Sequence, residues 1–466
     1  MDDRQRWVLA LTSVAALMVM LDMLVVTTAL DAIRRTLGAS ITGLEWTVNA
    51  FTLAFAVFLM TASALGDRLG RRKMLVAGLA VFTLASAACA VAPGTGALIA
   101  ARAAQGLGAA MVMPLAFSLL SAAFPPERRA KALGLFSGVT GLATLGGPLL
   151  GGAIVQGLSW QWIFWLNVPL GLVVIPLVRA RIPESTGPAA PLDLPGVTLV
   201  TGAAFGVVWA LVHGNGYGWT RLDVLGPLAV GLALGAGFVW WERRSPAPML
   251  PMRLFRSRAF SAGNATGFLL YASIFGTAFF LPQFLQIALH YGPLRAGLAL
   301  VPWTMTLTLV APVAGTRIAR FGERPLLAGG LFLQAVGFAW IALIAGPSLP
   351  YALLVPPLVL AGTGVSMAMP AAQHAVINSV GPAELGKASG AFNTLRQLGG
   401  TFGVVIVATV FTAAGGYGSP ATFTAGFGPA VGTAAVLSLT AAVAGLWLPG
   451  RRVNSEPAEP VLEVSR

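Results

Sequence analysis

Residues 106–114 read GLGAAMVMP, and 256 positions later residues 362–370 read GTGVSMAMP. PPERRAKALGLF at 125–136 returns loosely as GPAELGKASGAF at 381–392, at the same offset. DRLGRRKMLVAGL at 67–79 returns as ARFGERPLLAGGL at 319–331. One such pair could match by chance, but three pairs in the same order make chance improbable. The sequence therefore predicts two similar halves that follow one another along the chain.

The composition places both halves in a membrane. Hydrophobic residues make up 56% of the 466 residues and charged residues only 10%, with a mean hydropathy of +0.80. A soluble domain carries about 25% charged residues, and a helix crosses the hydrocarbon with about 20 apolar residues. We therefore expect an all-α membrane protein with fourteen spans, at 8–30, 44–65, 74–93, 97–123, 132–156, 161–179, 193–213, 221–242, 258–290, 294–317, 325–346, 350–374, 384–415 and 422–449.

Several other classes of protein do not fit these residues. The net charge is +13, but the basic residues form short clusters rather than a stripe, so we expect no nucleic-acid partner. Cys89 is the only cysteine and the three histidines are far apart, so we predict no metal site and no cofactor. The spans hold no paired carboxylates and no nucleophile–base set, so we do not expect an enzyme.

Basic residues in the loops set the orientation. With the N-terminus in the cytoplasm, 23 of the 29 Lys and Arg residues lie on the inner side. The outer loops keep only Arg34, Arg35, Arg221 and Arg295. Both termini are then cytoplasmic, and we expect a multi-pass protein of the plasma (inner) membrane.

The repeat and the spans together predict the domains. We expect an N-terminal six-helix half at 1–180, a two-helix insert with cytoplasmic linkers at 181–257, a C-terminal six-helix half at 258–449 and a cytoplasmic tail at 450–466. The two inserted spans keep the halves parallel and are expected to lie away from the central cavity. Parallel halves of this kind hold a substrate near the midplane between them and alternate access by rocking.

Two charged side chains lie inside the spans of the first half. Asp22 and Arg102 sit about 12 Å and 8 Å below the outer ends of their helices, at about 1.5 Å rise per residue, so they can meet. A lone charge at the bilayer centre costs roughly 2.5–3.5 kcal/mol on insertion scales, so each needs a partner or a wet cavity. Either Asp22 loads and releases a proton beside Arg102, or the two form a permanent salt bridge that fixes helix packing.

The loop between the second and third spans reads SALGDRLGRRK at 63–73. Gly70 permits a tight turn, and Asp67 can accept hydrogen bonds from helix-end amides or from a guanidinium group. With Arg68 and Arg71, the loop is either a cytoplasmic gate or ordinary positive-inside charge.

The fifth span contains GGPLLGG at 146–152. Gly147, Gly151 and Gly152 let helix backbones approach closely, and Pro148 bends the helix. The residues alone are consistent with either a gating element or generic helix packing.

A polar face is predicted in the second half. Arg396 lies about 18 Å along its span, close to mid-membrane, with Asn393 and Gln397 nearby. These side chains either contact substrate or pair with carbonyl groups. Glu45 and Asn49 in the second span complete the candidate substrate cavity.

Together these motifs resemble the fourteen-helix drug:H⁺ antiporter branch of the major facilitator superfamily, the EmrB/QacA type, over nearly the whole chain. The loop resembles the superfamily's first signature, with Ser63 in place of the leading glycine. RAAQGLGAA at 102–110 resembles the signature around the proton-linked arginine, and GGPLLGG resembles the antiporter signature of exporters. LDMLVVTTAL at 21–30 resembles the first-helix motif, although Asp31 stands where a proline is usual, and Ala319 replaces the acid in the second-half loop.

The resemblance implies proton-driven export of drugs, dyes or antibiotics, with Asp22 and Arg102 in proton coupling. The expected partners are a small amphiphilic drug-like substrate, protons and the lipid bilayer, and the expected state is a monomer. Because the second half has no acid deep within a span, neutral, weakly acidic or monocationic substrates are expected over dications. The alternative is a facilitator or importer of a small metabolite on the same fold, whose flux would not depend on a proton gradient.

Overall fold

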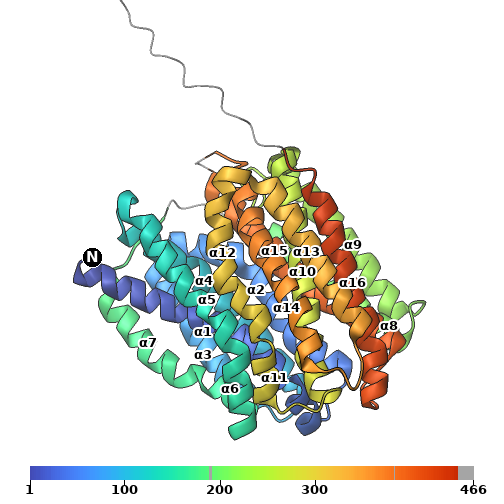
Figure 1. Ribbon diagram of the computed structural model, residues 1–466. Helices are drawn as coiled ribbons and strands as arrows, with labels where there is room; N and C mark the ends of the chain where they lie inside the picture. Colours follow the sequence, from blue (N-terminus) through green and yellow to red (C-terminus); the bar gives the residue numbers. More distant parts are fainter. Residues whose placement is uncertain (188–191, 382–383, 450–466) are drawn as a thin grey trace, which may run out of the picture.

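The computed structural model describes residues 1–187, 192–381 and 384–449, and regular structure in these ranges is helical throughout (Figure 1). Fourteen helical segments are long and apolar enough to cross a membrane, which confirms the predicted number of spans. The helices are α1 Asp3–Leu37, α2 Ile41–Leu69, α3 Arg71–Ala90, α4 Thr95–Ala123, α5 Pro126–Gly157, α6 Trp162–Trp165, α7 Asn167–Arg181, α8 Leu194–Tyr217, α9 Leu222–Arg244, α10 Arg258–Ile287, α11 Pro293–Ala299, α12 Val301–Phe321, α13 Glu323–Ile344, α14 Tyr351–Ile377, α15 Leu385–Ala414 and α16 Pro420–Gly445, with a 3₁₀ turn at Met252–Arg256.

Two predicted spans are broken into a short and a long helix. The sixth consists of α6 and α7, and the tenth consists of α11 and α12. Each break lies just before a proline, Pro169 or Pro302. Proline has no backbone N–H to donate to the preceding turn, so the helical ladder is interrupted there.

The C-terminal end of the first helix lies at Leu37, beyond the end of the predicted span at residue 30. Arg34 and Arg35, expected in an outer loop, lie in the last turn of α1 and form ion pairs with Asp31 at 3.2 and 2.8 Å. Gly38 then ends the helix with φ +63°, a conformation that favours glycine. Basic side chains in a last helical turn also suit the helix dipole, which explains the extra turns.

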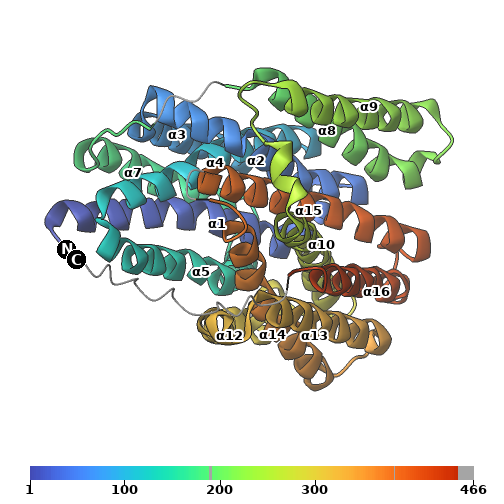
Figure 2. The ribbon, with the colours of Figure 1, turned by 90° about the horizontal axis from the view of Figure 1, so that it is seen from above.

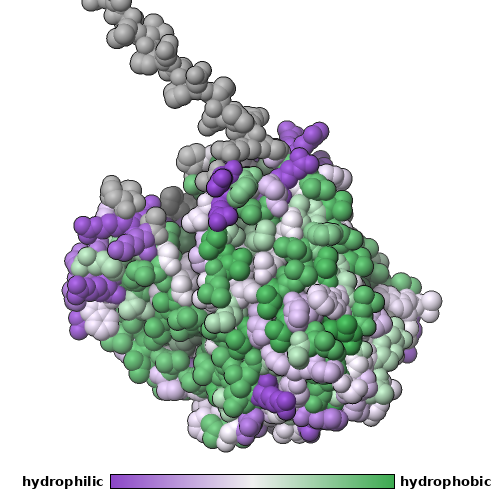
Figure 3. Space-filling model, in the orientation of Figure 1, coloured by the Kyte–Doolittle hydropathy of each residue, from purple (hydrophilic) through white to green (hydrophobic). Residues whose placement is uncertain are grey.

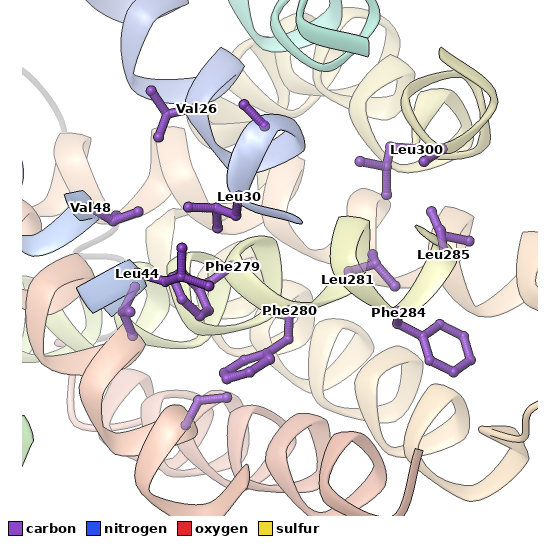
Figure 4. Packing of buried hydrophobic residues seen from close by; sticks show 14 of the residues in the cluster. Val26, Leu30, Leu44, Val48, Phe279, Phe280, Leu281, Phe284, Leu285 and Leu300 are labelled. Carbon is purple, nitrogen blue, oxygen red and sulfur yellow. The ribbon is translucent and has the colours of Figure 1, made fainter. Parts of the chain in front are cut away.

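The largest buried cluster joins helices from both ends of the sequence. Figure 4 shows side chains of α1 and α2, such as Leu30 and Leu44, gathered around Phe279 and Phe280 of α10. Farther along α10, Phe284 stacks on Phe427 of α16 with 4.2 Å between the ring centroids. Burial of apolar surface stabilises by about 25 cal/mol per Å², so these contacts help to hold α1 and α2 against α10, and α10 against α16.

The helices α8 and α9 lie side by side at one edge of the bundle (Figure 2). Asp193 caps the start of α8 and also accepts a hydrogen bond from Trp241 of α9 at 2.7 Å. Burial tends to raise the pKa of Asp193, but these hydrogen bonds outweigh it and lower the pKa overall. One face of α8 packs Val208 and Val212 against Trp46 of α2 and Val405 of α15.

The outer surface matches a protein immersed in lipid. In Figure 3 hydrophobic residues cover the flanks of the helices, and hydrophilic residues gather toward the ends. Exposed apolar side chains such as Leu222 and Leu343, each 86% exposed, are suited to a hydrocarbon environment. The chain is therefore a multi-pass membrane protein. The predicted tail, 450–466, lies outside the described residues.

Candidate functional site

Asp22 and Arg102 meet in the interior of the first helices. Arg102 Nη1 donates to Asp22 Oδ2 at 2.5 Å, and the two side chains are each 1% exposed. The predicted proximity of the two residues is therefore present in the structure. Arg102 Nε also donates to the Thr47 carbonyl oxygen of α2 at 3.1 Å. The guanidinium group thus ties α4 to α1 and α2 at once.

Neutral amides complete the shell around the carboxylate. Gln105 Nε2 donates to Asp22 Oδ1 at 2.7 Å and to Ser86 Oγ at 2.8 Å. Asn167 Nδ2 donates to the same Asp22 oxygen at 2.9 Å. Three donors on one buried carboxylate stabilise its charged form. We call Asp22, Arg102, Gln105, Asn167 and Ser86 the Asp22 network.

Neither amide of this network, Gln105 or Asn167, was predicted from the sequence. Gln105 lies one turn after Arg102, a spacing that points both side chains to the same helix face and is a usable signal. Asn167 lies in the aromatic run 160–171, which resembles a membrane-interface belt, and it is the first residue of α7, directly after the break from α6. The face of Phe51 lies 4.3 Å from the Arg102 guanidinium carbon and covers the charge.

The GGPLLGG segment forms a three-way contact. A Cβ on Gly147 would lie 2.7 Å from Leu24 Cβ of α1, and one on Gly151 would overlap Thr28 of the same helix. A Cβ on Gly152 would overlap the Pro293 carbonyl oxygen of α11, and one on Gly297 would overlap the Pro148 carbonyl oxygen. The predicted close approach is therefore made on two sides, toward α1 and toward α11.

The packing of α5 differs between its two ends. Along its first half, a Cβ built on Gly134, Gly138 or Gly141 has no atom of another described helix within 4 Å. Along its second half, the motif glycines contact α1 and α11, and Gln156 Oε1 accepts a hydrogen bond from the Leu294 amide at 3.1 Å. The helices are thus joined at the end away from the N-terminus (Figure 1).

A second set of contacts joins the same end. Gln286 Nε2 of α10 donates to the Thr28 carbonyl oxygen of α1 at 3.1 Å. The Arg34 guanidinium lies 5.0 Å from the ring centre of Tyr417, whose hydroxyl donates to Gln283 Oε1. Burial raises the pKa of Tyr417, and the nearby Arg34 charge lowers it only in part, so the phenol stays neutral and remains a donor.

The loop at 63–73 is held by the segment that follows α7. Arg71 Nε donates to Asp67 Oδ1 at 2.7 Å across the turn at Gly70, where φ is +110°. Glu184 accepts from the Arg72 and Lys73 amides at 2.9 and 3.3 Å and so caps α3. Arg68 is exposed at the end of α2. The sequence analysis did not identify Glu184, which lies 112 residues from its partner.

The second-half residues lie on α15 but make few polar contacts. The Arg396 guanidinium lies 5.1 Å from the ring centre of Tyr271, and its Nε atom has no hydrogen-bond partner among the described residues. Gln397 is 2% exposed, and its amide nitrogen likewise lacks a partner in the described ranges. Asn393 donates back to the Ser389 carbonyl oxygen at 2.9 Å. Unpaired buried donors leave room for a ligand or water.

The polar residues of α2 follow one face of the helix, away from the Asp22 network. Thr52 lies 2.8 Å from Thr401 of α15, hydroxyl to hydroxyl. One turn closer to the start of α2, Asn49 is fully buried, and both polar atoms of its amide lack partners within the described chain. Glu45 lies a further turn along and lines a pocket with residues of α8 and α15. The structure thus separates Glu45 and Asn49 from Asp22.

Comparison with known proteins shows which family the chain resembles. The model of the Major Facilitator Superfamily matches residues 12–404. The multidrug resistance protein Stp of Mycobacterium tuberculosis is 35% identical over 89% of this chain and 77% of its own length. The cephamycin export protein CmcT of Amycolatopsis lactamdurans is 36% identical over 98% of this chain and 95% of its own length.

Solved structures give the same fold. An auto-inhibited peptide transporter of the POT family superposes with a TM-score of 0.70, at 16% identity, over 98% of this chain and 99% of that one. At that identity the likeness concerns the fold alone. The tetracenomycin C resistance and export protein of Streptomyces glaucescens matches by sequence, at 35% identity over 85% of this chain and 74% of its own.

Proposed function

The chain belongs to the Major Facilitator Superfamily, and on that premise we propose that it is a proton-coupled exporter of small amphiphilic drug-like molecules. The named relatives, at about 35% identity over most of the chain, are multidrug-resistance and antibiotic-export proteins. The fourteen spans fit the drug:H⁺ antiporter branch. Export is the function that these relatives and this architecture support together.

One observation carries the proton-coupling part of the proposal. Asp22 is a carboxylate sealed at mid-helix, with one guanidinium and two amides donating to it. An ionised carboxylate keeps all three donors engaged, whereas a protonated one gives up part of that attraction and frees Arg102. Loading and releasing a proton at Asp22 would therefore loosen and tighten the contact between α1 and α4.

The helix that carries Asp22 also carries the motif contacts. Leu24 and Thr28, two and six residues after Asp22, are the α1 residues against which Gly147 and Gly151 pack. On its other side the same stretch of α5 lies against α11. A shift of α1 on protonation would thus be passed through α5 to α11, which supports a gating role for the motif.

The packing of α5 supports a particular state of the transport cycle. The end away from the N-terminus is closed by α5, α11 and Tyr417, while a Cβ built on Gly134, Gly138 or Gly141 near the start of α5 has no atom of another described helix within 4 Å. We propose that the protein lies in the plasma membrane with both termini in the cytoplasm. The joined end of the bundle then faces outward, and the structure represents a state closed to the outside. We propose that it works as a monomer by alternating access, with the halves at 1–180 and 258–449 moving against each other.

Efflux into everted membrane vesicles tests the proposal. Accumulation of a fluorescent substrate should start when a proton gradient is generated and stop when an uncoupler collapses it. Wild-type chain and Asp22→Asn should be compared at equal abundance in the membrane. Flux that an uncoupler leaves unchanged would instead favour a facilitator or an importer of a small metabolite.

A further inference from the structure

A pocket of about 550 Å³ opens at the end of the molecule where α2 begins, between α2, α8 and α15. Its wall includes Glu45 of α2, Val212 of α8 and Ala413 of α15, with Trp219 from the turn after α8. A volume of a few hundred Å³ is typical of a site for a drug-sized molecule. The inserted helices, which the sequence analysis set apart from the central cavity, supply one side of this pocket.

Glu45 is the acidic side chain among the described residues of the pocket wall. It is only 4% exposed, and no hydrogen bond or ion pair joins it to any residue in the described ranges. Removing a carboxylate from water without a partner is expensive, so a buried carboxyl group is neutral when it has no partner and ionises when a cation binds beside it. No Lys or Arg is among the described lining residues.

Arg34, a basic side chain at this end of the molecule, is already paired. Arg34 forms an ion pair with Asp31 at 3.2 Å and lies over the Tyr417 ring at 5.0 Å. Thr47, whose carbonyl oxygen accepts from Arg102, is two residues from Glu45. Two residues turn a helix by about 200°, so Glu45 and the Asp22 network lie on opposite sides of α2.

The rest of the wall combines four hydroxyl side chains with apolar and aromatic ones that suit an apolar or aromatic molecule; the hydroxyl residues are Ser40, Thr42, Thr409 and Thr412. Ile41, Val212 and Trp219 line the pocket, and the Trp46 and Trp209 rings pack beside it with 6.0 Å between their centroids. An aromatic face also attracts a cation directly. One unpaired carboxylate within such a wall matches one positive charge on a bulky apolar body.

We propose that this pocket is a second ligand site, separate from the Asp22 network, that binds a monovalent organic cation with Glu45 as its counter-charge. The site goes beyond the proposed export function, and its test measures binding alone. It therefore stands or fails independently of transport.

Cysteine protection tests the proposal directly. The only native cysteine, Cys89, is buried, so the unmodified chain serves as the unlabelled background. Ala413→Cys places a thiol on the exposed part of the pocket wall. Tetraphenylphosphonium should slow its reaction with a maleimide, whereas Ser348→Cys, exposed in the loop between α13 and α14, should react unchanged.

Charge dependence decides the outcome. Adding Glu45→Gln should raise the tetraphenylphosphonium concentration for half-protection at least about tenfold, and Glu45→Asp should restore part of the effect. Triphenylphosphine oxide, which is uncharged, should protect weakly and equally with either residue. Glu45→Gln is close to isosteric and removes a buried carboxyl group that has no partner in the described ranges, so the variant is expected to fold, and the Ser348→Cys labelling rate checks this.

Two results would overturn the proposal. One is equal protection by tetraphenylphosphonium with Glu45 and with Gln at that position. The other is loss of protection in Asp22→Asn as complete as in Glu45→Gln, because protection would then arise from a change elsewhere in the protein.

Discussion

Gly152 in α5 lies so close to Pro293 in α11 that a Cβ built on the glycine overlaps the proline carbonyl oxygen. The obstacle is backbone on both sides, and neither helix can yield by a side-chain rotation. The contact joins a helix of the first half of the chain to one of the second.

Gly152→Ala is therefore expected to separate α5 from α11. Overpacking of this kind costs roughly 1–3 kcal/mol, and we expect at least about a tenfold loss of efflux with a lower unfolding temperature in detergent. Gly146→Ala is the matched control, because the only atom within 4 Å of its Cβ belongs to Leu150 of the same helix, at 3.9 Å. Equal activity of the two variants would rule out a gating contact at Gly152.

Asp22→Asn should abolish proton-driven efflux, because an amide does not ionise. The single variant also leaves Arg102 as an unpaired buried charge, at a cost of about 3–5 kcal/mol. The double variant Asp22→Asn with Arg102→Gln should recover thermal stability and stay uncoupled. Efflux at the wild-type rate under a proton gradient in either variant would refute the assignment of Asp22.

Asn167→Ala should move the pH profile of efflux. It removes one of three donors to the ionised carboxylate, so the proton is held more tightly and the profile moves to higher pH by up to about one pH unit. Asn264→Ala, a buried asparagine of α10 that bonds its own helix, is the control and should leave the profile in place. An unchanged profile in Asn167→Ala would mean that this amide only supports packing.

Glu184→Ala should destabilise the loop between α2 and α3. It removes the acceptor for the Arg72 and Lys73 amides, and losing a helix cap costs about 1 kcal/mol. The unfolding temperature in detergent measures the effect. Asp223→Ala removes an acid from the first turn of α9 whose ion pair is exposed, and it should change stability far less. Equal effects of the two variants would contradict a capping role for Glu184.

The sequence predicted the spans well because apolar length is a strong and local signal. It also predicted that Asp22 and Arg102 can meet, since helix rise and direction fix the depth of a charge. It did not reveal Asn167 or Glu184, because a neutral amide or a loop acid has no periodic pattern, and their partners are distant in sequence. The helix breaks at Leu166 and Leu300 were not predicted, because the sequence remains apolar on both sides of each proline and a hydropathy pattern does not register the interruption.

The Asp22 network draws every side chain from residues 22–167, that is, from the proposed N-terminal half. The proposed C-terminal half instead contributes the amides of Asn393 and Gln397, aromatic rings and the Arg396 guanidinium to the candidate substrate cavity. We expect that substitutions in the C-terminal half can change which substrate is bound without disturbing the Asp22 network. A chimera that keeps the first six spans and exchanges the last six would retain the Asp22 network and is expected to transport a different set of substrates.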